Sequence, residues 1–343
     1  MFLNFYSLNE QPFGVTPDPR FLYLTPAHRE ALASLFYGID EGRGFMALIA
    51  KPGMGKTTLL VHLLERFRAT AQTAFIFQTQ CTSREFMRFL LAEIGCEVGT
   101  EQDLVTLHEE FNRRLLREAR EGRRFILIVD EAQNLDASVL ETIRLLSDFE
   151  TPRAKLLQIV LAGQPQLADK LSRPSLGQLR QRISVLSSLA PLPYAETERY
   201  MEHRLRVAGY RSGTPFTTAA KRLIADISDG IPRNINNLCF GALSLGYALQ
   251  QRTIDADVIR EVVADLDLSK LASDSRASSI DEAAVLQKLK SDLDLVTLDK
   301  KTILARTEQF DTDARKDVPS VAEAQAYIQQ IIQLLNNWQR SVN

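Results

Sequence analysis

The chain has 343 residues and a formal net charge of −2, so it is long enough for two or three domains, and its overall charge does not indicate affinity for polyanions. Its three cysteines, Cys81, Cys96 and Cys239, contain no C-x-x-C pair, and their odd number favours reduced thiols. No apolar run approaches the roughly 20 residues that span a bilayer, and the N-terminus does not follow a secretory-signal pattern. We therefore expect a cytoplasmic protein with no integral membrane segment.

The first 44 residues predict an N-terminal strap followed by a helix. Residues 1–24 are rich in aromatic residues and proline, a composition that suits an irregular segment packed onto a core. Thr25 and Pro26 then provide a helix N-cap and a proline at the first helical position, so a helix should follow through Phe36. His28 falls in its first turn, where a packing or surface role is favoured over a nucleotide contact.

The stretch from Ala50 to Thr58 has the pattern of a phosphate-binding loop. It lies between an apolar strand, Phe45–Ile49, and a periodic helical segment that starts at Leu59. Ala50 stands where the motif G-x-x-x-x-G-K-[ST] has its first glycine, which is a mild departure because the strand ends there. We assign phosphate binding to Pro52, Gly53, Met54, Gly55, Lys56, Thr57 and Thr58.

Each part of this loop has a chemical reason. Gly53 and Gly55 allow the backbone N–H groups to turn toward phosphate oxygens, and the following helix N-terminus adds its positive dipole end. Lys56 can reach the β- and γ-phosphates, and the Thr57 hydroxyl is placed to bind Mg²⁺. The loop alone therefore predicts phosphate binding together with Mg²⁺, and ATP as the ligand follows only from the further motifs and the resemblance below.

A second strand ends in two carboxylates. The run from Phe125 to Val129 is typical of a strand buried in a parallel sheet, and Asp130 and Glu131 follow it directly. In a phosphate-loop protein this is the Walker B pattern, in which Asp130 would bind Mg²⁺ and Glu131 would orient and polarise the attacking water. A further strand is expected after the phosphate loop at residues 74–77, with helices near 83–95 and 103–120.

Gln164 follows another buried strand, Leu156–Gly163. Ligands of open parallel sheets bind beyond the carboxyl ends of the strands, so Gln164 could contact the γ-phosphate or the water. Its alternative role is to cap the helix that starts at Pro165.

Arginines occur before the last expected strand, residues 185–189, and along the expected helix at 103–120. Arg180 and Arg182 could complete the site of a neighbouring subunit, because a guanidinium is a planar fork suited to phosphate oxygens. A surface salt bridge is the alternative for either of them. The six arginines from Arg113 to Arg124 are interspersed with glutamates, which favours a solvated helix face over a nucleic-acid contact.

Beyond Pro191 helical periods replace strand signals, with helices expected at 195–208, 217–228, 232–249 and 254–265. The turn from Gly230 to Arg233 places Arg233 near the start of one of these helices. We divide the remaining chain into an α/β core at 45–190, a helical domain at 191–268, a linker at 269–285 and a helical C-terminal tail at 286–343. Heptad spacing in the tail fits packing within the chain or pairing with another chain.

Together these motifs resemble an AAA+ ATPase, a class of P-loop NTPases. The N-terminal spelling from Phe5 to Leu24, the DEAQNL run at Asp130–Leu135 and the LAGQP run at Leu161–Pro165 are similar to the ExeA/GspA (general secretion pathway protein A) group. The resemblance covers about residues 1–268 and extends to related transposition-regulator (TnsC/TniB-like) ATPases.

The resemblance implies an α/β fold with a parallel sheet of strand order 5-1-4-3-2, a helical lid, and the strap near the adenine. It makes Gln164 the sensor 1 residue and Arg233 the sensor 2 residue that contacts the γ-phosphate. It makes Arg182 the preferred arginine finger acting on a neighbour, with Arg180 in reserve. Nucleotide would then bind between subunits of a homo-oligomer.

These expectations predict an ATP-hydrolysing motor or switch that acts on a protein partner through its tail, in a system related to secretion or export. Members of the secretion group usually continue into a membrane span and a peptidoglycan-binding domain, and neither pattern is visible in this sequence. The alternative is a DNA-bound scaffold that forms a ring or filament in the presence of ATP.

Overall fold

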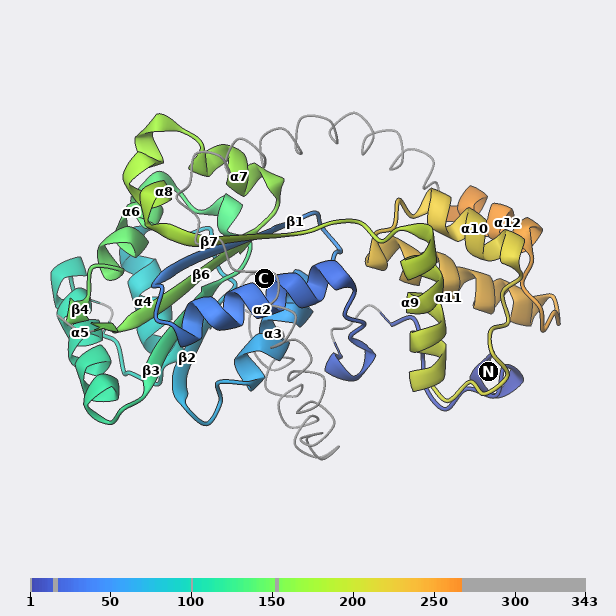
Figure 1. Cartoon of the computed structure of the whole chain (residues 1–343), viewed down its shortest axis with the longest axis horizontal. Helices are drawn as coiled ribbons and strands as arrows, with labels where there is room; N and C mark the ends of the chain where they lie inside the picture. Colours follow the sequence, from blue (N-terminus) through green and yellow to red (C-terminus); the bar gives the residue numbers. More distant parts are fainter. Residues whose placement is uncertain (1, 15–17, 100, 152–153, 267–343) are drawn as a thin grey trace. The chain divides into compact units, whose positions relative to one another are not determined.

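The computed structural model describes residues 2–14, 18–99, 101–151 and 154–266. Figure 1 shows a sheet with helices against both of its faces, followed in the chain by a group of helices. The linker and tail expected at 269–285 and 286–343 lie outside the described residues.

The central sheet has five parallel strands in the expected order. Across the sheet they are β2 (Ala71–Ile76), β3 (Arg124–Val129), β6 (Leu157–Gly163), β1 (Phe45–Ala50) and β7 (Ile183–Leu189). The residues of β1 and β6 are all buried, as expected for central strands of a parallel sheet that is covered on both faces. The predicted α/β fold and its strand order are confirmed.

Each face of the sheet contributes to a separate apolar cluster. In β1, Met46 and Leu48 join one cluster, whereas Phe45 and Ala47 join the other, because successive side chains point to opposite faces. Figure 1 shows the helices of both layers. The first layer contains α2 (Pro26–Asp40) and α3 (Lys56–Glu65), and the second contains α4 (Ser83–Glu93), α5 (Leu104–Arg120), α6 (Ala137–Leu146), α7 (Pro165–Leu171) and α8 (Gly177–Arg182).

The structure differs from the expected elements at several boundaries. Strand β2 starts three residues earlier than expected and ends before Phe77, which is 40% exposed. A short antiparallel pair, β4 (Glu150–Thr151) and β5 (Ala154–Lys155), and helix α8 were not expected. Strand β7 starts at Ile183, so Arg182 is the last residue of α8 and directly precedes the strand.

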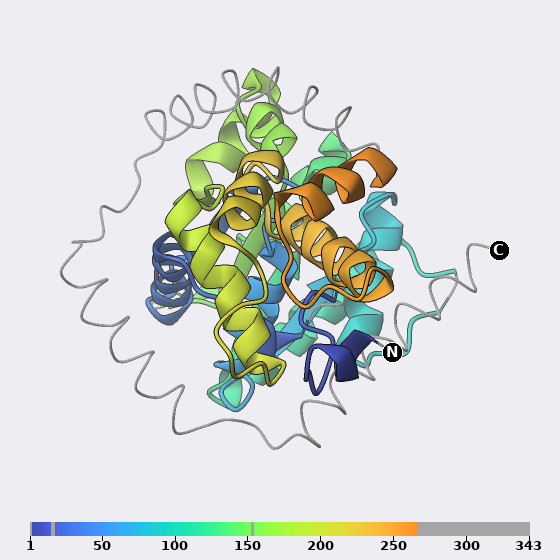
Figure 2. The ribbon, with the colours of Figure 1, turned by 90° about the vertical axis from the view of Figure 1, so that its right-hand side faces the viewer.

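The helices after β7 lie within a few residues of the expected ranges. Figure 2 looks onto this group, which consists of α9 (Tyr194–Val207), α10 (Thr218–Ile227), α11 (Pro232–Ala248) and α12 (Ala256–Leu266). Their interior is apolar, with Met201, Ile224 and Leu238 fully buried. Pro232 occupies the first turn of α11, where its missing N–H costs no intrahelical bond.

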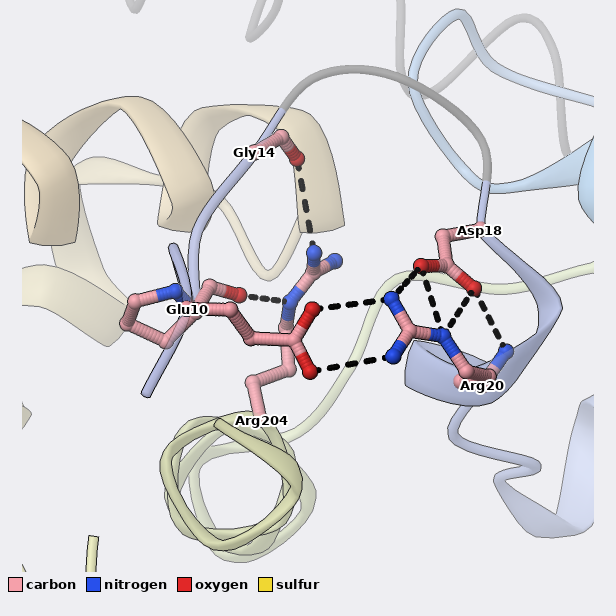
Figure 3. Close-up of polar contacts among 6 residues, drawn as sticks. Glu10, Gly14, Asp18, Arg20 and Arg204 are labelled. Atoms are coloured by element: carbon pink, nitrogen blue, oxygen red, sulfur yellow. Dashed lines mark hydrogen bonds and ion pairs between the residues drawn. The ribbon is translucent and has the colours of Figure 1, made fainter. Parts of the chain in front are cut away.

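The N-terminal segment is attached to the same helical group. Helix α1 (Phe2–Phe5) places the ring of Phe2 6.0 Å from that of Phe240 on α11, and the Tyr6 hydroxyl donates to the carbonyl of Gln251 at 2.8 Å. Arg204 on α9 donates to the carbonyl of Pro12 at 2.5 Å and to that of Gly14 at 3.4 Å (Figure 3). The strap is therefore tied to the helices by hydrogen bonds as well as by aromatic packing.

A second arginine closes the strap on itself. Figure 3 shows Arg20, on the short helix η1 (Pro19–Phe21), between two carboxylates. Its guanidinium donates to both oxygens of Glu10, at 3.0 and 2.8 Å, and to Asp18, at 2.6 Å. These ion pairs join the two ends of the loop that connects residues 10 and 20.

None of the helices in the described part of the chain has the length and apolar character to cross a membrane.

Candidate functional site

The phosphate loop has the backbone that its glycines predict. Gly53 and Gly55 have φ angles of +80° and +86°, in the left-handed region that glycine enters without steric cost. Gly55 is the N-cap of α3, which begins at Lys56, so the free N–H groups of the first turn are available to an anion. Ala50 closes β1 as a buried residue, and its methyl group fits there.

His28 lies beneath this loop and is buried, with 3% of its surface exposed. Its Nε2 lies 3.1 Å from the carbonyl oxygen of Met54, and its Nδ1 lies 2.6 Å from Oγ1 of Thr25. Because a carbonyl oxygen only accepts, Nε2–H is the donor to Met54 and Nδ1 accepts from the threonine hydroxyl. Burial lowers the pKa of His28, although the bond to Met54 opposes this shift. The histidine thus supports the loop, in line with the packing role expected for it.

The two expected Mg²⁺ ligands lie together. The Thr57 hydroxyl donates to Oδ2 of Asp130 at 2.6 Å, although the two residues are 73 positions apart in the chain. Burial raises the pKa of Asp130, and the hydrogen bonds from Thr57 and from the Glu131 N–H partly offset it. A hydroxyl and a carboxylate are oxygen ligands of the kind that Mg²⁺ prefers, and it usually takes only one or two protein carboxylates at phosphate sites. These residues fit the expected ion.

Glu131 lies at the centre of a polar set drawn from three strand ends. Its Oε1 is 3.7 Å from Nζ of Lys56, and its Oε2 accepts from Nε2 of Gln164 at 3.0 Å and from Nε2 of Gln133 at 2.6 Å. Burial would raise the pKa of Glu131, but the Gln133, Gln164 and Lys56 groups outweigh it, so the pKa lies below its ordinary value. A carboxylate that stays ionised can accept a proton from water.

Two residues of this set were missed from the sequence. Gln133, on the short helix η2 (Ala132–Asn134), contacts Glu131 and also accepts the backbone N–H of Gln164 at 3.0 Å. Lys170 on α7 donates to the carbonyls of Gln133 and Leu135 at 2.6 and 2.7 Å. Gln133 follows Glu131 by only two residues, and this spacing could have indicated a contact between them. No feature of the sequence near Lys170 indicates its role.

Arg233 lies beside the phosphate loop. Its backbone N–H donates to the carbonyl of Gly53 at 3.2 Å, and a Cβ added to Gly53 would lie 2.6 Å from the Cβ of Arg233. The first turn of α11 therefore contacts the loop closely, and only glycine at position 53 permits this approach. The structure brings Arg233 to the site, while its contact with a phosphate stays a prediction.

Arg180 and Arg182 have partners outside this polar set. Arg182 forms an ion pair with Asp148 and donates to Oγ of Ser147 at 3.2 Å. Arg180 donates to the carbonyl of Ser172 at 3.3 Å. None of these contacts involves Lys56, Asp130 or Glu131. The salt-bridge alternative thus holds for Arg182 within its own chain.

Most of the arginines on and after α5 have acidic partners. Arg113 pairs with Glu110 at 2.6 Å, Arg114 with Glu118 at 2.9 Å, and Arg124 with Asp40 at 2.9 Å. Arg123 pairs with both Glu118 and Glu121. This pattern agrees with an ion-paired face, although Glu118 itself is fully buried and so is not part of a solvated surface. A DNA contact by these residues stays a prediction.

Comparisons with known proteins fit this geometry. Residues 39–171 match the family model described as AAA domain. The chain is 38% identical over 248 residues to General secretion pathway protein A of Aeromonas hydrophila, a match that covers 72% of this chain and 45% of that protein. The expected resemblance to GspA-like AAA+ proteins is confirmed.

A second relative is an uncharacterized HTH-type transcriptional regulator of Methanocaldococcus jannaschii, 30% identical over 42% of this chain and 36% of that protein. The chain thus spans less than half the length of either relative in these matches. Among solved structures, the ORC2 protein of Aeropyrum pernix in its ADPNP-ADP complexes gives a TM-score of 0.59 at 17% identity, covering 75% of this chain and 71% of that one. Cdc6p of Pyrobaculum aerophilum gives 0.58 at 16% identity, covering 74% and 70%. Both likenesses concern the fold.

Proposed function

We propose that this chain binds and hydrolyses ATP with Mg²⁺ and works as a homo-oligomeric switch or motor. The observation that carries the proposal is the meeting of Lys56, Glu131 and Gln164 at the carboxyl ends of three parallel strands, with Thr57 and Asp130 joined beside them. This edge of an open sheet is where such folds bind ligands. The match of residues 39–171 to the AAA domain model supports the same chemistry.

The chain's own residues divide the work. The loop N–H groups and Lys56 bind the phosphates, and Thr57 with Asp130 would hold Mg²⁺, which neutralises phosphate charge when bound. Glu131 orients the attacking water and accepts its proton. Gln164, which already donates to Glu131, stands near enough to act on the same water or on the terminal phosphate.

Arg182 and Arg233 would have the two remaining roles in this mechanism. Arg182 of one copy would enter the site of the next and stabilise the charge that develops on the transferred phosphoryl group. Arg233 would report the state of the nucleotide to the helices after β7, since its backbone already contacts Gly53. Movement of those helices is the output that a partner would sense.

For the biological role, we propose a cytoplasmic protein that acts on a protein partner in a system related to secretion or export. The support is the 38% identity to General secretion pathway protein A. A tail that contacts the partner, residues 286–343, is part of the same proposal.

The test is ATP hydrolysis by the full chain with and without Mg²⁺. Lys56→Ala should abolish ATP binding or turnover, whereas Glu131→Gln should bind ATP normally and lose turnover by at least about 100-fold, because the base is gone. Glu97→Gln, an exposed glutamate on the connection after α4, is the matched control and should behave as the parent. Normal turnover in the Glu131→Gln protein would contradict the assignment.

A further inference from the structure

The side chain of Gln133 links Glu131, which follows β3, to Gln164, which follows β6. Its Nε2 donates to Oε2 of Glu131 at 2.6 Å, and its Oε1 accepts the backbone N–H of Gln164 at 3.0 Å. A flipped amide would set its NH₂ group against the Gln164 N–H, so the two bonds fix the orientation of the amide. Gln133 therefore presents a donor to the carboxylate in one defined position.

The two oxygens of Glu131 consequently have different surroundings. Oε2 accepts two amide hydrogen bonds, from Gln133 and from Gln164. Oε1 lies 3.7 Å from the Lys56 ammonium, the one polar contact found for it among the described residues. When Lys56 turns to phosphate oxygens, Oε1 is released, while Oε2 keeps both of its donors.

The surroundings of Gln133 hold it in place from α7 and β6. Lys170 donates to its backbone carbonyl at 2.6 Å and to that of Leu135 at 2.7 Å, which anchors the loop after β3. Gly163 at the end of β6 leaves room for the amide, because a Cβ there would lie 2.8 Å from Oε1 of Gln133. The position of Gln133 is thus set by residues of β6 and α7, the two elements that Gln164 joins.

We propose that Gln133 is a positioning residue that holds Oε2 of Glu131 so that Oε1 alone is presented to the attacking water. The inference rests on the proposed ATP hydrolysis. In that reaction the water oxygen bonds to the γ-phosphorus, the bond from this phosphorus to the ADP oxygen breaks, and Oε1 receives the proton of the water. Lys170 acts one step further out, by fixing the loop that carries Gln133.

The test compares Gln133→Met and Gln133→Glu with the control Asn134→Ala, using kcat and KM of the full chain for ATP with Mg²⁺. Asn134 is the exposed neighbour on η2. Gln133→Met keeps the side-chain length but removes the donor, so kcat should fall about 10- to 100-fold, the range that a misplaced reacting group costs, while KM stays within about two-fold. Gln133→Glu keeps an acceptor for Gln164 but sets a second carboxylate against Glu131, so its kcat should be lower still. Asn134→Ala should match the parent in both constants.

An unchanged kcat in Gln133→Met would overturn the inference, as would an increase, which would mean that Gln133 restrains Glu131. A kcat loss matched by an equal rise in KM would also overturn it, because that pattern indicates a distorted binding site. If Gln133→Met does not fold, Lys170→Met decides the matter, with a smaller loss of kcat expected at constant KM and no loss contradicting the proposal. The proposed function itself fails only if the parent lacks ATPase activity or Glu131→Gln turns over normally.

Discussion

The polar set around Glu131 and the arginines at the end of α8 differ in whether their side chains already contact the other residues of the candidate site. Lys56, Asp130, Glu131 and Gln164 come from three strand ends and already contact one another or a shared neighbour. Arg182 pairs instead with Asp148, and its contacts remain within its own layer of helices. Under the proposed function, one copy would supply all of the site except the positive charge that the arginine of a second copy adds.

The largest effect should come from removing that charge. Arg182→Ala should lower kcat about 1,000-fold, because an arginine finger contributes about 10³ or more to phosphoryl transfer, while ATP binding is retained. Arg180→Ala removes the same charge two residues away and should cost no more than a few-fold. ATPase assays of both variants decide between them, and the reverse ranking would assign the role to Arg180.

The next effect concerns the contact between the loop and α11. Gly53→Ala should reduce kcat/KM by about 10- to 100-fold, because the new Cβ would lie 2.6 Å from Arg233 Cβ and the left-handed backbone disfavours alanine. Gly122→Ala has a similar positive φ but nothing within 4 Å of the added Cβ, so it controls for backbone strain alone. Equal behaviour of the two variants in steady-state assays would show that the approach of Arg233 is unimportant.

A smaller effect is expected at Asp148. Its ion pair with Arg182 is between partly exposed groups, with 44% and 31% of their side-chain surface accessible, and such pairs contribute at most about 1 kcal/mol. Asp148→Asn should therefore lower the protein concentration at which ATPase activity is half-maximal, by no more than about five-fold. An increase in that concentration would mean that Asp148 orients Arg182 for assembly.

The smallest expected effect is on the pH dependence of stability, through the buried His28 beneath the phosphate loop. Burial keeps the pKa of His28 below its ordinary value, so the unfolded chain binds the proton more tightly and stability falls as the pH drops below about 6.5. His108 and His203 also have pKa values lowered by burial, so the contribution of His28 is the difference between the parent and His28→Gln. Urea unfolding at several pH values should show a shallower acid loss in the variant, and parallel curves would contradict the buried, neutral imidazole.

The sequence predicted the sheet well, because buried strands are a local feature, and it named Lys56, Asp130, Glu131 and Gln164, which the structure brings close together. Apolar runs bounded by glycine or by paired acids identify the buried strands, and the same runs place Lys56 and Glu131 at strand ends. The strand order followed from resemblance and is confirmed.

Features that depend on distant contacts could not be predicted. Gln133 and Gln164 are 31 residues apart, and Lys170 reaches carbonyls 35 and 37 residues away, so no periodicity reveals these bonds. Helix α8 is only six residues long, too short for a helical period to be recognised. The place of Arg233 beside Gly53 depends on how α11 packs against the loop, and only the resemblance, not the local sequence, predicted that it reaches the site.

The most direct test of a shared site is to mix two inactive variants. Lys56→Ala lacks its own phosphate-binding lysine but keeps Arg182, and Arg182→Ala keeps an intact loop. If Arg182 acts in the site of a neighbour, an equimolar mixture should recover a substantial fraction, about a quarter, of the parent ATPase activity through interfaces that pair an intact loop with an intact arginine. A mixture no more active than the average of the two separate proteins would contradict the shared site.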